Sequence, residues 1–170
     1  MKNLGREFID QCVLRINEYT DKVFSCLDEL DEEEIWRRPN EASNSGGNII
    51  LHLCGNIRQY IISSLGRLPD NRERDKEFSA KGGYTKSELK RKLRTTVDDA
   101  IKTIEESDED ILTQIRSVQG FTMTGVGIIL HVTEHYSYHT GQIIFWTKFL
   151  KNKDLGFYVG FDLNRKNKND

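Results

Sequence analysis

The stretch LGREFIDQCVLRINEYTDKVFSCLDEL (residues 4–30) decides the fold class. Its mostly apolar positions recur at alternating intervals of four and three residues, which places them in one narrow stripe along an α-helix. The stripe consists of Ile9, Val13, Ile16, Thr20, Val23, Leu27 and Leu30. Because a stripe of this width is the packing surface of a helix in a bundle, residues 4–30 predict a helical bundle.

Three later segments carry similar helical patterns. A second helix is expected to begin at Ser43 or Ser45, whose hydroxyl can cap the first free amides, and to end near Gly66. A third begins at Thr85, which forms a capping box with Glu88. A fourth is expected from about residue 124 to 150. With no strong strand signal, these helices predict an all-α four-helix bundle with long connections.

The segments between the helices are expected to be mostly irregular. The connection that contains Trp36 is predicted to lay this ring over one end of the bundle, and a short helical turn is expected at Glu109–Leu112. The apolar tail segment 155–161 is expected to pack against the bundle or a partner chain. Residues 1–170 are predicted to form one domain, with a flexible tail from about residue 163.

The bulk composition excludes several classes of function. The formal net charge is −2, which disfavours nucleic acid as a partner. No apolar run approaches the roughly 18 residues that a membrane span needs. The three cysteines, Cys12, Cys26 and Cys54, form no CxxC motif and are read as reduced. We therefore expect a cytoplasmic protein that contacts neither nucleic acid nor membrane.

Three of the four histidines lie in HVTEHYSYHTGQI (residues 131–143), at intervals of four. Helical residues four apart are offset by about 6 Å of rise, so their imidazoles can converge on one ion. His131 and His139 are separated by about 12 Å of rise, too far to share a metal. Any chelating pair must therefore contain His135, with either His131 or His139 as its partner.

A third ligand has to come from another helix. His52 is the remaining histidine, and it lies on the apolar side of the second helix beside Ile49 and Leu53. A histidine in such a position needs a hydrogen bond or a metal to offset its burial. Three histidines that leave open positions on the ion are typical of catalytic sites.

Two segments resemble the DinB-like metal-binding four-helix bundles, which include the YfiT-type proteins and the bacillithiol and mycothiol S-transferases. They are NIILHLCGNIRQYI (48–61) and EHYSYHTGQI (134–143), and the fuller run around the first resembles a branch of unestablished function. The resemblance implies a divalent metal, zinc or nickel, held by His52, His135 and His139, with His131 outside the ligand set. It also implies a long crossover between helices two and three, and a homodimer.

What the resemblance implies about function is a metal-dependent enzyme. The ion would activate a low-molecular-weight thiol, as in a thiol S-transferase, or water, as in a hydrolase. A non-enzymatic metal-binding stress or interaction protein is the alternative class. The substrate is expected to be a small molecule.

Several polar residues lie near the predicted ligands in sequence. Asn56 and Gln142 could orient a ligand or bind substrate, or could simply face solvent. Glu134 could serve as a base or pair on the surface. Tyr138 and Arg58 are candidates for substrate binding. Arg58, with Arg72 and Arg74, could line an entrance for an anionic substrate or belong to a solvated loop.

Overall fold

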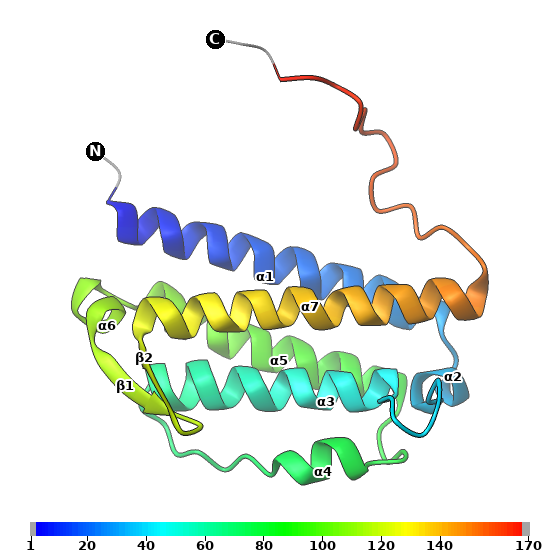
Figure 1. Ribbon diagram of the computed structural model, residues 1–170, viewed down its shortest axis with the longest axis horizontal. Helices are drawn as coiled ribbons and strands as arrows, with labels where there is room; N and C mark the ends of the chain where they lie inside the picture. Colours follow the sequence, from blue (N-terminus) through cyan, green and yellow to red (C-terminus); the bar gives the residue numbers. More distant parts are fainter. Residues whose placement is uncertain (1–2, 168–170) are drawn as a thin grey trace.

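Four long helical segments form a bundle in the computed structural model, which describes residues 3–167 (Figure 1). They are α1 (Leu4–Glu29), α3 (Gly46–Ile57) continued by the π-helix η1 (Arg58–Leu65), α5 (Lys86–Glu105) and α7 (Gly125–Lys151). Helix α1 contacts α7 and α5, and α3 contacts α5 and α7. The predicted all-α four-helix bundle is therefore confirmed.

The helices begin where the capping residues predict. The Ser45 side chain accepts a hydrogen bond from the amide of Asn48, whose side chain reciprocates, so Ser45 rather than Ser43 starts α3. Thr85 and Glu88 form the expected capping box of α5. Thr124 caps α7. A lost N-cap costs about 1 kcal/mol, so each residue helps to fix its helix start.

The stripe of α1 faces the core of the bundle. Ile9, Ile16, Val23 and Leu27 are buried, and each such side chain contributes about 1.5–3 kcal/mol when it leaves water. Thr20, the polar member of the stripe, is buried too. Its hydroxyl lies 2.8 Å from the hydroxyl of Tyr136 on α7 and 2.8 Å from the carbonyl oxygen of Ile16. Thr20 therefore links α1 to α7, and its buried hydroxyl has hydrogen-bond partners.

The second helix changes its winding halfway along. The predicted helix reaches Gly66 as expected, but from Arg58 to Leu65 it is a π-helix, in which Gly66 donates from its amide to the carbonyl of Ile61. A π-helical stretch holds more residues per turn than an α-helix, so it rotates the side chains that follow it. Tyr60, Ile61 and Ile62 are all buried there, which a 3.6-residue period does not predict.

Most connections contain short elements that the sequence patterns did not predict. They are α2 (Glu32–Trp36), α4 (Arg74–Ser79) and the hairpin of β1 (Ile115–Val118) with β2 (Phe121–Thr124). The predicted turn at Glu109–Leu112 is confirmed as α6 (Glu109–Thr113). The hairpin turns at Gln119 and Gly120, which both have positive φ, as a two-residue loop between antiparallel strands requires.

Trp36 and the tail contact the bundle in part as expected. Trp36 is half-buried against the core, and its indole donates to the carbonyl of Tyr84 at 3.1 Å. Leu155 and Phe157 also pack against the core. Further along, Tyr158, Val159 and Phe161 are exposed, and the chain leaves the bundle after α7 (Figure 1).

Residues 163–167 form neither helix nor strand, and residues 168–170 of the expected flexible tail lie outside the described residues. Within the described part of the chain, every helix is too short or too polar to cross a membrane.

Candidate metal centre

His52, His135 and His139 meet between α3 and α7. Nε2 of His135 lies 3.0 Å from Nε2 of His52 and 3.2 Å from Nε2 of His139. One ligand nitrogen from each histidine lies within 4.8 Å of the others. Helix geometry left two partners open for His135, and the structure brings it together with His139 and with His52 from the second helix. These are the three residues that the sequence resemblance implied.

The spacing of these nitrogens fits the coordination shell of a divalent ion. At metal–nitrogen distances of about 2.1 Å, ligand nitrogens lie about 3.0 Å apart in an octahedral shell and about 3.4 Å apart in a tetrahedral one. The two short nitrogen–nitrogen distances fall in this range. Imidazole nitrogens also suit zinc, nickel and other first-row metals. The described residues thus form a cluster that could hold a metal.

His135 and His139 are in the protonation state that metal binding requires. Burial, aided by the charges of neighbouring histidines, lowers the pKa of His135 to about 3. Burial also lowers the pKa of His139 to about 4. Both rings are therefore neutral at pH 7 and keep a lone pair on one nitrogen. His52 is buried, with 7% of its surface exposed.

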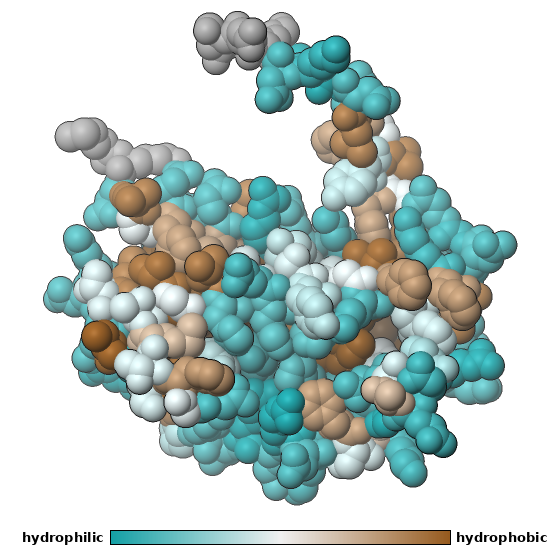
Figure 2. Space-filling model, in the orientation of Figure 1, coloured by the Kyte–Doolittle hydropathy of each residue, from teal (hydrophilic) through white to brown (hydrophobic). Residues whose placement is uncertain are grey.

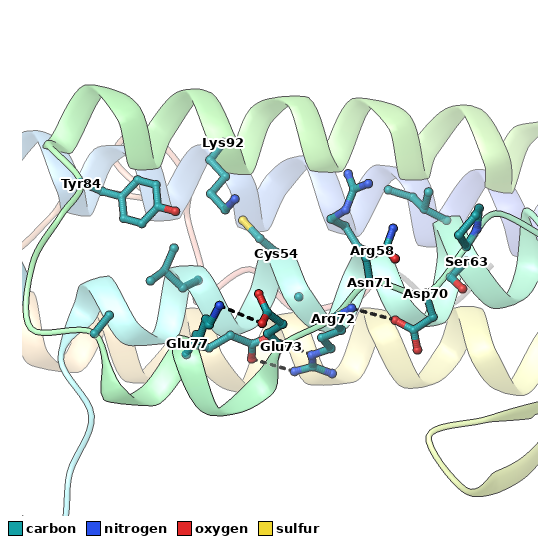
Figure 3. Close-up of a pocket in the computed structure, with 16 residues that line it drawn as sticks. Cys54, Arg58, Ser63, Asp70, Asn71, Arg72, Glu73, Glu77, Tyr84 and Lys92 are labelled. Carbon is teal, nitrogen blue, oxygen red and sulfur yellow. Dashed lines mark hydrogen bonds and ion pairs between the residues drawn. The ribbon is translucent and has the colours of Figure 1, made fainter.

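Behind His52, the crossover between η1 and α5 supplies a buried ion pair. Oε2 of Glu77 lies 3.0 Å from Nδ1 of His52. Arg72 donates to both carboxylate oxygens of Glu77, at 2.7 and 2.9 Å. The Arg72 and Glu77 side chains are 4% and 9% exposed. Figure 3 labels both residues among the side chains that line a neighbouring cleft.

Glu77 determines which nitrogen of His52 carries the proton. Nη2 of Arg72 also lies 3.1 Å from Nδ1, but a carboxylate can only accept, so Nδ1 must donate to Glu77. The Nε2 lone pair then faces the cluster. Burial raises the pKa of Glu77, yet the hydrogen bonds from Arg72 and His52 outweigh it, and the net pKa is lowered. Glu77 is therefore a charged acceptor at pH 7.

Gly55 makes room for this ion pair. It lies on α3, close behind His52, and a Cβ at this position would overlap Oε1 of Glu77 and lie 2.9 Å from Nε of Arg72. Only a residue without a side chain lets the carboxylate approach the helix so closely. The position of Glu77 in the crossover therefore depends on a glycine at position 55 of α3.

Gln142 supports His139 as the sequence spacing suggested. Its Oε1 lies 2.7 Å from Nδ1 of His139, so Nδ1 donates and the Nε2 lone pair faces the cluster. Nδ1 of His135 is buried and has no partner among the described residues. Two of the three histidines therefore have their tautomer set by a side-chain acceptor.

His131 lies one turn outside the cluster, next to Asn56. Its ring stacks on Tyr60, with centroids 4.3 Å apart, and its Nε2 lies 3.4 Å from the side-chain nitrogen of Asn56. Burial lowers the pKa of His131. The structure thus places Asn56 beside His131, rather than behind His52 where the sequence spacing had suggested it. His131 therefore packs on Tyr60 and contacts Asn56.

The remaining candidates are more peripheral. Glu134 is exposed, and so is Arg58, which faces a different cleft. Tyr138 is 63% exposed, and its ring lies 5.0 Å from that of His139. Arg74 is exposed with its guanidinium 4.8 Å from the Phe78 ring. The Arg72 side chain, by contrast, is only 4% exposed, so it does not belong to a solvated loop.

Two clefts flank the buried ion pair. One, of about 720 Å³, is lined by His52 and His139 together with α4 and the C-terminal half of α7. The other, of about 380 Å³, lies on the far side of Arg72 and Glu77 and is lined by Cys54, Arg58 and Lys92 (Figure 3). Because only the larger one is lined by histidines of the cluster, a small molecule that reaches the histidines would occupy the larger cleft.

Three residues of the crossover contact His52; sequence patterns missed Glu77 and Phe78, and they gave Arg72 a different role. These are Arg72, Glu77 and Phe78, whose ring centroid lies 4.8 Å from that of His52. The general rule that a ligating histidine donates to a carboxylate could have suggested an acidic residue. The crossover offers Asp70, Glu73, Asp75 and Glu77. Choosing among them requires the tertiary structure.

Comparisons with solved structures agree with this fold. A DinB-like protein from Bacillus cereus ATCC 10987 superimposes with a TM-score of 0.63 at 18% identity, over 79% of this chain and 87% of that one. A DinB-like protein from Bacillus subtilis, YjoA, gives a TM-score of 0.65 at 14% identity, over 85% and 94%. At these identities the likeness shows the fold alone. No curated protein matched the chain.

A family model of sequences without a known role matches nearly the whole chain. Its description is "Protein of unknown function (DUF1572)", and it covers residues 3–158, which include all four histidines and every helix of the bundle. The fold of the DinB-like proteins and the three-histidine cluster are thus found together in one matched segment. The chain belongs to the DUF1572 family.

Proposed function

We propose that the protein is a metal-dependent enzyme that transfers a low-molecular-weight thiol to an electrophilic small molecule. Its ligands are His52, His135 and His139, and zinc or nickel is the metal. The observation that carries the proposal is the convergence of three imidazoles beside a cleft of about 720 Å³. When bound, the ion supplies Lewis acidity, which lowers the pKa of a thiol or water.

The chain's own residues prepare this chemistry. Glu77 and Gln142 hold the Nδ1 protons of His52 and His139, so both Nε2 lone pairs point to one place. Arg72 neutralises Glu77, which keeps the carboxylate fixed and stops it from taking a proton from the substrate. Phe78 packs on His52 and covers one side of its ring.

The pairing of Glu77 favours a thiol over water as the nucleophile. Among the described residues, Glu77 is the carboxylate bonded to the cluster, and Arg72 already occupies both of its oxygens. A water nucleophile usually needs a free base, whereas a thiol, with an ordinary pKa of about 8.5, ionises readily beside a cation. In the transfer, the S–C bond forms as the bond from carbon to the leaving oxygen breaks. The thiol proton ends on that oxygen.

The test combines small thiols with an epoxide acceptor. Cysteine, glutathione and coenzyme A are each offered to zinc-loaded and nickel-loaded protein, and thioether formation is followed by mass spectrometry. We expect turnover with at least one thiol, and its loss in His139→Ala. Turnover of an ester or amide without any thiol reaction would make the protein a hydrolase. Stoichiometric metal without either activity would support the non-enzymatic alternative.

A further inference from the structure

The cleft beside the histidines has an unusual lining. Five of its side chains are aromatic, namely Phe78 on α4 and Tyr138, Phe145, Trp146 and Phe149 on α7. Figure 2 shows apolar surface gathered over the C-terminal half of α7, where four of these side chains lie. Trp146 and Phe149 stack nearly parallel, with centroids 5.4 Å apart and 10° between planes. The walls therefore suit a flat, apolar body.

The electrostatic character of the cleft is positive. Among the described residues that line it there is no aspartate or glutamate, and Arg74 is the one permanently charged side chain. The smaller cleft, by contrast, is lined by Asp70, Glu73 and Glu77 alongside its basic residues. Arg74 stacks on Phe78, and no carboxylate of the described residues pairs with it. Its guanidinium is thus available to an anion from outside the chain.

The Phe78 ring contacts both the Arg74 guanidinium and His52 of the cluster. One neighbour of its ring is His52, with centroids 4.8 Å apart, and another is the Arg74 guanidinium, whose carbon lies 4.8 Å from the ring centroid. Arg74 and Phe78 are four residues apart on α4, so they share one helix face. An anion held by Arg74 would therefore lie one aromatic ring away from the histidine cluster.

We propose that this cleft binds a small molecule with an aromatic or similarly flat apolar body and a negatively charged group, and that Arg74 recognises the charge. The cleft volume of about 720 Å³ lies within the range of small-molecule sites. The inference rests on the proposed function in one respect, because it identifies the bound molecule as the substrate of that same site. The reacting atom and the charged group would then lie at opposite ends of the substrate.

The test uses three probes, of which two differ only in charge and two differ only in the aromatic ring. They are 3-phenylpropionate, its neutral amide 3-phenylpropionamide, and propionate, which lacks the ring. Dissociation constants are measured by ligand-detected NMR on zinc-loaded protein and again on protein treated with EDTA, where a carboxylate cannot bind a metal. We expect 3-phenylpropionate to bind most tightly in both forms, and about fivefold more tightly than the amide.

Two variants separate charge from shape. Arg74→Gln should bring the acid and the amide to the same affinity, without a change in zinc content. Phe149→Ala should weaken both ring-bearing probes. Arg91→Gln, which changes an exposed arginine of α5 that does not line the cleft, is the matched control and should leave all three affinities unchanged.

Several results would overturn the proposal. Equal binding of acid and amide by the wild type would do so, as would a preference that survives Arg74→Gln. If Phe149→Ala leaves probe affinity unchanged but converts a dimer to a monomer in sedimentation, the aromatic face is a subunit contact instead. Zinc uptake without a probe preference refutes this inference alone. A preference without zinc uptake refutes the proposed function and leaves the inference standing.

Discussion

Nδ1 of His52 lies 3.0 Å from Oε2 of Glu77, so a side chain of the crossover supports a histidine of α3 from behind. Arg72 completes this support by binding both oxygens of the carboxylate. The histidine cluster and the packing of α4 on α3 therefore depend on one another. When α4 packs on α3, the buried charge of Glu77 has to be paired.

Replacement of Glu77 by glutamine should weaken metal binding about 10–100-fold, because His52 loses the charged acceptor that fixes its tautomer. Zinc affinity is measured by competition with a chromophoric chelator, on protein whose helix content is checked by circular dichroism. Glu73→Gln, which removes only a surface pair with Lys76, is the control and should bind zinc normally. An affinity of Glu77→Gln within twofold of the wild type would show that Glu77 does not position His52.

Gly55→Ala should displace Glu77 without changing any polar group. A methyl at this position overlaps the carboxylate, so we expect a loss of about 1–3 kcal/mol in unfolding free energy, together with weaker zinc binding. Gly141→Ala is the matched control, because nothing lies within 4 Å of a Cβ added there. It should add up to about 1 kcal/mol of stability, as Gly→Ala does in helices. Urea unfolding of the metal-free proteins measures both effects, and equal behaviour of the two variants would contradict this account.

The bundle could be predicted from the sequence because local patterns determine it. The stripe from Ile9 to Leu27 and the caps at Ser45, Thr85 and Thr124 all depend on neighbours within a few residues. The hairpin was missed because its turn is Gln119-Gly120 rather than the usual Asn-Gly. The π-helix from Arg58 was missed because an ordinary helical period does not detect a change of winding.

The candidate site could be predicted only in part. Helical spacing alone showed that any chelating pair of histidines must contain His135. The family resemblance then identified His139 and His52 as the other two ligands. The support of His52 by Glu77 depends on how the crossover folds back on α3, which no local pattern encodes. The same holds for Arg72, whose burial follows from its partner and not from its polar neighbours in sequence.

The cysteines should be unreactive in the folded protein. Burial raises the pKa of Cys12, that of Cys26 to about 11 and that of Cys54 to about 12. Because the thiolate is the nucleophile, at most about one Cys26 or Cys54 thiol in a thousand is ionised at pH 8, and raising the pH to 9 should change little. Ellman's reagent should therefore titrate no thiol in native protein and three after unfolding in urea. A thiol that reacts within seconds in the native state would contradict this prediction.

Metal binding should stabilise the fold, because the three ligands converge only in the native state. At a free zinc concentration of about 100 times the dissociation constant, the gain is about 2.7 kcal/mol. For a chain of this length, that raises the thermal midpoint by about 5–10 °C. Calorimetry with zinc and with EDTA measures the shift. His139→Ala should show almost none of it, and an equal shift in that variant would indicate binding elsewhere.

The metal content of untagged protein tests the three-histidine site most directly. Plasma mass spectrometry of the wild type and of four single alanine variants gives the ratio of metal to chain. We predict nearly one ion per chain in the wild type, its loss in His52→Ala, His135→Ala and His139→Ala, and its retention in His131→Ala. Metal that is retained in His139→Ala and lost in His131→Ala would contradict the assignment, and so would a wild type that binds none.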